Sequence, residues 1–341
     1  MLKKQKIAVV AVIAVFILVL TVGFFAFSGT NEIIIAEFSG KKVLLGDYDC
    51  FIEFNRRIEI REKRDYILKS LKFSHYLAKK EVRITEEDIN KAYAELAKEY
   101  FGEKENFTDY YIPIAKSAKI DYNSLKESLR YYAGAVAATN AFKNYAKAQF
   151  EAQDKTADDY NPELDGFTFA LEKEAVKEQA AIVTSFAESK NEFGVSNYEK
   201  HYDCFVAFAA AASKFETVQS IALYKGIDEL YGKEADITEL EAYLETIFGG
   251  IRRIDGYEGI LTDMNATEFE FFAQARKFYR NVYVYEQLTK GYFSEKYHLK
   301  KTAGTLPEGV ETLEDYAAYI LIDTALKCKV VTTDFEWNNQ K

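Results

Sequence analysis

The chain has 341 residues, of which 48% are hydrophobic and 15% aromatic, with only three prolines and a formal net charge of −10. This apolar content is ample for packed cores and excludes wholesale disorder, and the acidic balance disfavours nucleic acid as a partner because phosphate binding needs a basic surface. Proline is the commonest interrupter of helices, so its scarcity predicts a mostly α fold.

A basic start is followed by an uncharged run that contains no proline. Residues 1–6 carry three lysines, and residues 7–27 hold no charged side chain. A helix over 7–27 would span roughly 30 Å, the thickness of a bilayer core. We predict a single-pass transmembrane signal anchor, with the basic tip in the cytoplasm and the bulk of the chain outside the cell membrane. The alternative is a signal peptide cleaved near the small residues Ala26 and Ser28.

Short strands are predicted at two places far apart in the sequence. Ile33 to Phe38, a turn at Ser39-Gly40, and Val43 to Leu45 read as a hairpin because β-branched residues flank a turn pair. An amphipathic helix over 316–327 precedes a second strand at 330–332. We expect this last strand to pair with the first hairpin.

The segment after the hairpin has the apolar spacing of helices. Helices are predicted over 48–58 and 65–80, and Thr85 with Asp88 is typical of a capping box that opens a third helix. Beyond Asn123, apolar residues at a 4,3,4,3 spacing predict a long closing helix of about seven turns.

The second half of the chain repeats the first. The residues Tyr-Asp-Cys-Phe that begin at Tyr48 recur at Tyr202, at an offset of 154, and the Ile-Thr-Glu around Thr85 recurs around Thr238, at an offset of 153. Thr238 with Glu241 is expected to form the second capping box. A stripe from Phe269 through Phe272 and Ala275 to Val282 is expected to form the second closing helix, with Asn123 equivalent to Thr267 at an offset of 144.

These repeats predict a domain organisation with an internal duplication. Two copies of one helical unit cover residues 31–150 and 166–300, and a polar linker at 151–165 joins them. Residues 301–341 add a C-terminal helix and a strand that returns to the first unit.

The order of elements resembles the N-terminal chaperone domain of the SurA and PrsA type of extracytoplasmic foldases, which is similar to the helical substrate-binding part of trigger factor. The likeness is carried by the opening strand with its turn at Ser39-Gly40, by the helix-opening phrase from Val82 to Ile89, by the helix over 123–145 and by the terminal strand at 326–331. It implies a membrane-anchored chaperone that holds unfolded or newly translocated polypeptides without a nucleotide or other cofactor.

Enzymatic members of that family add a parvulin prolyl-isomerase domain, usually where the linker lies here. The second copy occupies that place, and His75, His201 and His298 fall in helical patterns without the i, i+4 spacing of a metal helix. We therefore expect neither catalysis nor a metal site. Two alternatives stay open: a peptidyl-prolyl isomerase with a β-rich domain around 154–195, and an envelope assembly scaffold with one dedicated protein partner.

The three cysteines are Cys50, Cys204 and Cys328, too few and too scattered for a metal site or a disulfide framework. Cys50 and Cys204 stand at equivalent positions of the two copies beside aromatic residues. We expect them to be buried, unpaired packing residues.

The aromatic surplus supplies the candidate client-binding residues. Neighbouring rings on a helix diverge by about 100°, so both members of an adjacent pair are not expected to face one core. Either some rings line a groove for extended apolar segments, or the two copies pack on one another through them. The candidates are Tyr110, Tyr111, Tyr131, Tyr132, Phe271, Phe272 and Tyr279.

Overall fold

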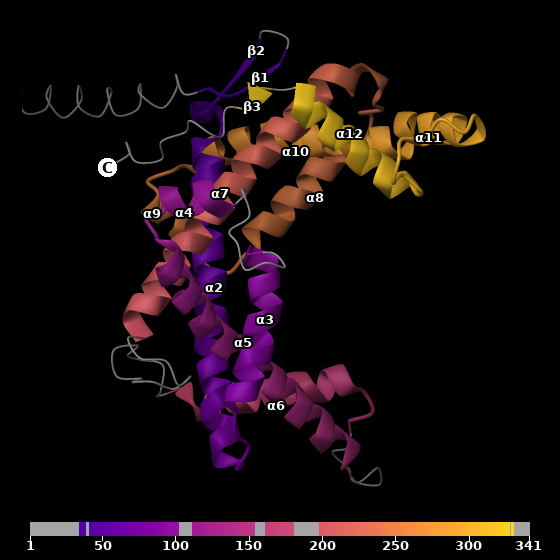
Figure 1. Cartoon of the computed structure of the whole chain (residues 1–341). Helices are drawn as coiled ribbons and strands as arrows, with labels where there is room; N and C mark the ends of the chain where they lie inside the picture. The colour runs from indigo at the N-terminus through magenta and orange to yellow at the C-terminus, as the bar shows by residue number, and fades with distance from the viewer. Residues whose placement is uncertain are drawn as a thin grey trace, which may run out of the picture. The chain divides into compact units, whose positions relative to one another are not determined.

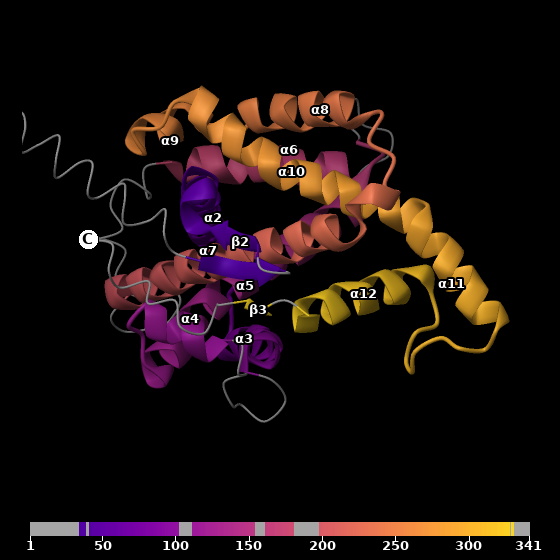
Figure 2. The same ribbon diagram turned by 90° about the horizontal axis from the view of Figure 1, so that it is seen from above.

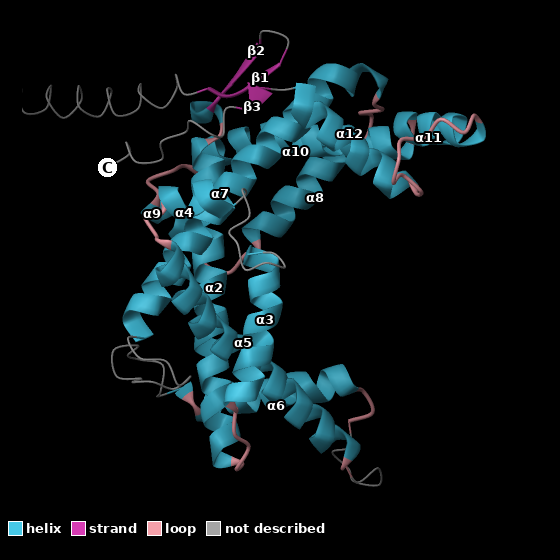
Figure 3. Cartoon of the chain, in the orientation of Figure 1, coloured by secondary structure: helices cyan, strands magenta, loops and turns pink. Residues whose placement is uncertain are grey.

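The computed structural model describes residues 34–38, 41–101, 111–153, 161–180, 198–327 and 329–330. These residues are almost entirely helical (Figures 1, 2 and 3), which confirms the mostly α prediction. No helix among them is both long and apolar enough to cross a membrane. The basic tip at 1–6 and the anchor predicted over 7–27 lie outside the described residues.

The described residues form two compact units. Unit 1 combines residues 34–55 with 214–330, and unit 2 consists of residues 56–213. The two boundaries fall inside helix α2 (Asp49–Lys79) and helix α7 (Tyr198–Tyr231). Unit 1 therefore joins two separate stretches of the sequence, unit 2 is one continuous stretch, and each contains residues of both predicted copies.

A small antiparallel sheet in unit 1 joins the two ends of the described chain. Strand β1 (Ile34–Phe38) lies between β2 (Lys41–Leu44) and β3 (Lys329–Val330), as Figure 3 shows in magenta. Pairing runs from Ile34 opposite Leu44 to Phe38 opposite Lys41, and Ala36 lies opposite Val330. The predicted hairpin and the return of the last strand to it are confirmed, while the turn at 39–40 lies outside the described residues.

Unit 2 is built around helix α5 (Tyr122–Glu151). Its other elements are α2 from Arg56 on, α3 (Glu86–Phe101), α4 (Tyr111–Ser117), α6 (Leu164–Glu178) and α7 as far as Ser213. Phe73 of α2 stacks on Phe142 of α5 with ring centroids 4.0 Å apart, and Ala175 of α6 completes that cluster. Burial of these rings and methyl groups supplies the main stabilisation of the unit.

Unit 1 has the same plan around helix α10 (Glu268–Lys290). Its other helices are α7 from Lys214 on, the short η3 (Gly232–Glu234), α8 (Leu240–Arg252), α9 (Tyr257–Asp263), α11 (Tyr292–Thr302) and α12 (Leu313–Lys327). A cluster of buried residues from α7, α10, α11 and α12 includes Ile227, Leu288 and Tyr316.

Helix α2 is a single helix of 31 residues, where the sequence predicted separate helices over 48–58 and 65–80. Residues 59–64 hold neither glycine nor proline, so nothing in the backbone ends the first helix before the second begins.

The duplication covers one more helix per copy than the sequence indicated. Within the described chain, α2 and α7 have 31 and 34 residues, α3 and α8 have 16 and 13, and α4 and α9 have 7 each. Helix α5 has 30 residues and matches α10 and α11, which have 23 and 11, while α6 and α12 have 15 each. The matching order assigns α6 to the end of copy one and α12 to the end of copy two, which differs from the predicted bounds at 150, 166 and 300.

The helix caps fix how the two closing helices align. Asp121 caps α5 by accepting a bond from the backbone of Ser124, and Thr267 caps α10 in a complete capping box, 146 positions further along. At this spacing Leu125 matches Phe271 and Phe142 matches Leu288, and all four side chains are buried. The predicted offset of 144 is wrong, because Phe269, its counterpart to Leu125, is 82% exposed.

The two predicted capping boxes have different outcomes. Asp88 accepts bonds from both the backbone N–H and the hydroxyl of Thr85, and Thr85 Oγ1 accepts from Asp88 N–H, which confirms the first. The second is wrong, because the backbone N–H and hydroxyl of Thr238 bond Asp236 Oδ1 instead and α8 begins without a side-chain cap.

The first turns of each copy's first helix pack on the closing helix of the other copy. Phe51 at the start of α2 lies 4.9 Å from Phe278 of α10, measured between ring centroids. Its counterpart Phe205 at the start of α7 stacks on Tyr132 of α5 at 4.2 Å. Tyr132 and Phe278 are themselves equivalent at the spacing of 146, so the two contacts are the same contact made twice.

Phe51 and Phe205 are the exchanged rings, because each belongs to one copy and packs on the closing helix of the other. Replacing either of them is expected to destabilise the protein strongly. Phe51→Ala and Phe205→Ala each remove a buried ring, which costs about 3–5 kcal/mol of unfolding free energy. Chemical denaturation of the full chain measures the loss. Phe169→Ala, at a ring that is mostly exposed, is the matched control and should change stability by less than about 0.5 kcal/mol. Equal effects of all three changes would contradict the exchange.

Neither copy is expected to fold well alone. Residues 31–180 lack the ring that covers Tyr132, and residues 198–341 lack the ring that covers Phe278. When each fragment is produced alone, we expect it to unfold without a cooperative transition. When the two fragments are produced together, we expect them to purify as a complex that unfolds cooperatively. Cooperative unfolding of either fragment alone would show that the exchanged contact is dispensable.

Candidate functional site

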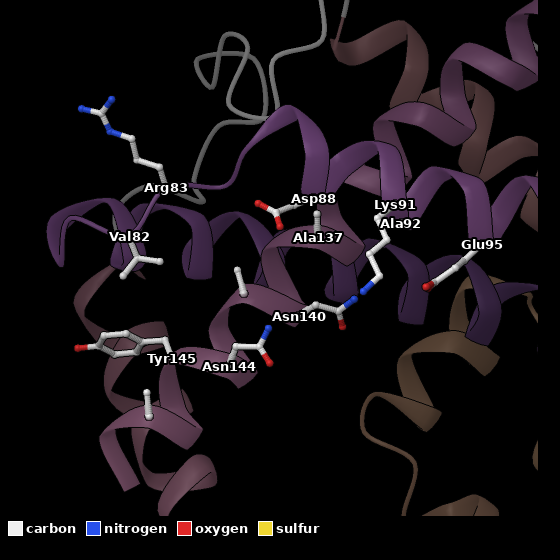
Figure 4. A pocket seen from close by; sticks show the side chains of 12 residues that line it. Val82, Arg83, Asp88, Lys91, Ala92, Glu95, Ala137, Asn140, Asn144 and Tyr145 are labelled. Carbon is white, nitrogen blue, oxygen red and sulfur yellow. The ribbon is translucent and has the colours of Figure 1, made fainter. Parts of the chain in front are cut away.

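A groove of about 480 Å³ lies between α3 and the second half of α5 in unit 2 (Figure 4). Four alanines contribute small side chains to its lining: Ala92, Ala137, Ala141 and Ala148. Its polar lining consists of Arg83, Asp88, Lys91, Glu95, Asn140 and Asn144. At one end Val82 and Tyr145 face each other (Figure 4).

Local sequence signals set the entry of α3 beside this groove. Helix α2 ends at Lys79, and Glu81 adopts a left-handed conformation with φ of 61°, so the chain turns sharply. The N–H of Val82 then bonds the carbonyl of Leu77 at 2.9 Å. The Thr85–Asp88 box closes the first turn of α3, and these hydrogen bonds hold the pKa of the Asp88 carboxyl below its usual range. Asp88 is therefore a fixed negative charge at the mouth of the groove.

Polar contacts link α3 to α5 on the edge of α3 that faces away from the groove. Arg130 of α5 donates one bond to Glu86 at 2.7 Å and another to Asn90 at 2.9 Å. The Arg130 and Glu86 side chains are largely exposed, so their ion pair links α3 to α5 along one edge but contributes little stability. The alanines of the groove lie along the opposite edge.

The charges in the groove balance. Arg83 and Lys91 oppose Asp88 and Glu95, and Figure 4 shows Lys91 extending toward Asn140 while Arg83 points away from the other labelled side chains. Asn140 and Asn144 are exposed and stand one turn apart on α5. A side-chain amide both donates and accepts hydrogen bonds, so this wall suits a neutral polar ligand better than a strongly charged one.

Most of the aromatic candidates from the sequence lie in the cores of the units. Tyr131 and Phe271 are 1% and 0% exposed, and Tyr132 is buried beneath Phe205. Tyr279 is half-buried, and its ring contacts Phe51 at 5.8 Å. Tyr132, Phe271 and Tyr279 pack on the first turns of α7 and α2, and Tyr131 lies in the core of unit 2.

The remaining candidates have different positions. Phe272 is half-buried, with Phe248 at 4.5 Å and the Arg252 guanidinium 4.5 Å above its ring. Tyr111 is the first residue of α4, and neither its side chain nor Tyr110 lies within the described residues.

The expectation that adjacent rings do not share one core is wrong for Tyr131 and Tyr132. Both are buried, because α2, α3 and the start of α7 cover the middle of α5 on several sides. Residues 131–135 are all buried there, whichever way they diverge, while Asn140 and Asn144 further along the helix are exposed.

The cysteines and histidines form no metal or disulfide site in the described residues. Neither Cys50 nor Cys204 forms a disulfide, and both are only half-buried, which corrects the expectation of burial. Burial, with help from nearby carboxylates, raises the pKa of Cys50 to about 11, so its thiol stays protonated and unreactive at neutral pH. Cys328 lies outside the described residues.

Sequence reasoning missed the groove. Its signals were present, because Ala137, Ala141 and Ala148 recur at helical spacing beside Asn140 and Asn144. Small residues on a helix usually indicate close packing, as they do at Ala92 and Ala137, so the pattern alone does not reveal the groove beside them.

The chain matches no protein-family model, no curated protein and no solved structure.

The buried tyrosines predict a loss of stability in alkali. Burial, the largest cause, raises the pKa of Tyr48 and of Tyr257 to about 12 and also raises that of Tyr279. A tyrosine in the unfolded chain ionises near pH 10. Because the folded pKa values are the higher ones, this contribution to stability is complete below about pH 10 and is lost as the pH rises from 10 toward 12.

Unfolding free energies from pH 8 to 12, followed together with tyrosinate absorbance, measure this effect. Tyr257→Phe should make the alkaline decline shallower, because one linked ionisation is removed. A stability that stays constant through pH 11 would contradict the assignment of these rings to the core.

Proposed function

We propose that this protein is a membrane-anchored, extracytoplasmic, ATP-independent chaperone of the SurA type, which holds unfolded or newly translocated polypeptides without isomerase catalysis. The observation that carries the proposal is the pairing of β3 with β1. A terminal strand that returns to an opening hairpin, with long helices in between, is the arrangement that the resemblance led us to expect.

Exposed apolar side chains support a holding function. Large hydrophobic residues stand in solvent in both units, and such side chains can contact the apolar segments of a non-native chain. They are Leu164, Phe169, Leu230, Ile237, Phe269, Leu299, Tyr319 and Ile322. The groove beside α3 adds polar contacts to this apolar surface.

The membrane and compartment parts of the proposal rest on the sequence of residues 1–27. Three lysines before an uncharged run of this length favour a cytoplasmic tip and an external body. Helical units on a tether of this kind would meet polypeptides as these emerge from the membrane.

Helix α6 bears on the alternative of a prolyl isomerase. That hypothesis needs a compact β-rich domain around residues 154–195, and 164–178 within this stretch form α6. Residues 154–160 and 181–197 lie outside the described part. The helix therefore favours a holding function over catalysis.

Suppression of client aggregation tests the proposal. The full chain in phospholipid nanodiscs is mixed with lactalbumin that aggregates on reduction, and light scattering is recorded without ATP. We expect suppression at near-stoichiometric ratios, with empty nanodiscs as the control. A failure to suppress with several unrelated clients would refute the chaperone, and a pull-down that returns one stable partner would then favour the scaffold.

A further inference from the structure

The two copies differ at the place where copy one has the groove. At the spacing of 146 that the helix caps fix, Ala137 of α5 is equivalent to Tyr283 of α10. Tyr283 is buried against Leu240 and Leu244 of α8, and Tyr243 lies 4.9 Å from its ring. Rings and leucines therefore fill the space between α8 and α10, whereas Ala92 and Ala137 bring α3 close against α5 and the groove opens beside them.

The polar positions at this place also differ. Asn140 and Asn144 of copy one are equivalent to Glu286 and Lys290 of copy two. Burial, together with the nearby Glu286 carboxylate, raises the pKa of Tyr243 to about 12. The groove instead presents two neutral amides, so the copies differ in both shape and polarity at this one place.

The geometry of the amides fits an extended peptide backbone. Residues four apart on a helix are separated by about 6 Å along its axis. Alternate residues of an extended chain are separated by about 6.6–6.8 Å. An extended segment that runs along α5 can therefore place one peptide group at Asn140 and the next peptide group but one at Asn144.

The lining selects what kind of segment fits. The alanines that line the groove let a peptide backbone approach closely but leave little depth for large side chains. The groove's volume of about 480 Å³ is within the ordinary range of ligand sites. The two positive and two negative side chains cancel, so a charged segment gains nothing on entering. An uncharged segment loses the least hydration free energy on entering the groove.

We propose that the groove between α3 and α5 binds an uncharged, extended polypeptide segment with small side chains, whose backbone bonds Asn140 and Asn144. This inference rests on the proposed chaperone function and assigns a client site to copy one alone. The equivalent place in copy two is structural.

Binding of three labelled peptides to the full chain in nanodiscs tests the proposal by fluorescence polarisation. The probes are blocked twelve-residue peptides of alternating Ala-Ser, Ala-Glu and Ala-Lys. We expect the Ala-Ser peptide to bind at least ten-fold more tightly than either charged one. Equal binding of all three would overturn the proposal.

Paired variants locate the site. Asn140→Ala with Asn144→Ala should weaken Ala-Ser binding about five- to ten-fold, through the loss of two hydrogen bonds. Alanine favours the helix, so the unfolding free energy should not fall. The matched control is Lys143→Ala with Lys147→Ala, at exposed positions of the same helix, and should bind as the unchanged chain does. Unaltered binding by the asparagine variant would overturn the proposal.

A photo-crosslinking residue distinguishes the occupants. p-Benzoylphenylalanine at position 148, which lines the groove, should capture unfolded carboxymethylated lactalbumin, and the same residue at 147 should capture at least ten-fold less. Capture of a second copy of this chain at 148 would overturn the proposal. Suppression of aggregation without capture at 148 would refute the groove and leave the chaperone standing, whereas peptide binding without suppression would refute the chaperone alone.

Discussion

The fold depends on the exchange of aromatic helix starts between the two copies. Phe51 covers the closing helix of copy two, and Phe205 covers that of copy one. Without the exchanged ring, each closing helix would expose the aromatic surface around Phe278 or Tyr132. Because apolar burial is the main favourable term in folding, neither copy has a complete core of its own. The exchange explains why both compact units cut across the sequence repeat.

The exchange also explains the aromatic composition. A helix on the outside of a bundle needs one apolar stripe, but α5 and α10 are covered on several sides and need rings on each of them. Tyr131 and Tyr132 show the result, as do Phe271 and the half-buried Phe272, which packs on α8 and α9. Much of the aromatic surplus is therefore explained by two central helices that are each covered on several sides.

Local signals made part of this structure predictable. Proline scarcity predicted the helices, β-branched runs predicted the hairpin, and the Thr85–Asp88 pair predicted the start of α3. The partner of each ring was not predictable, because a sequence repeat shows that Phe51 and Phe205 are equivalent but not which helix each one covers. The frame of α10 was misplaced by two residues, since Phe269 and Phe271 look alike until burial separates them.

Duplication leaves equivalent positions of the two copies free to differ. Tyr283 and its neighbours on α8 fill one position with large side chains, whereas Ala92 and Ala137 bring α3 against α5 at the other and the polar groove opens beside them. The cores of both units depend on the exchanged rings and not on the exposed amides of the groove. Asn140 and Asn144 can therefore change with little cost to either core.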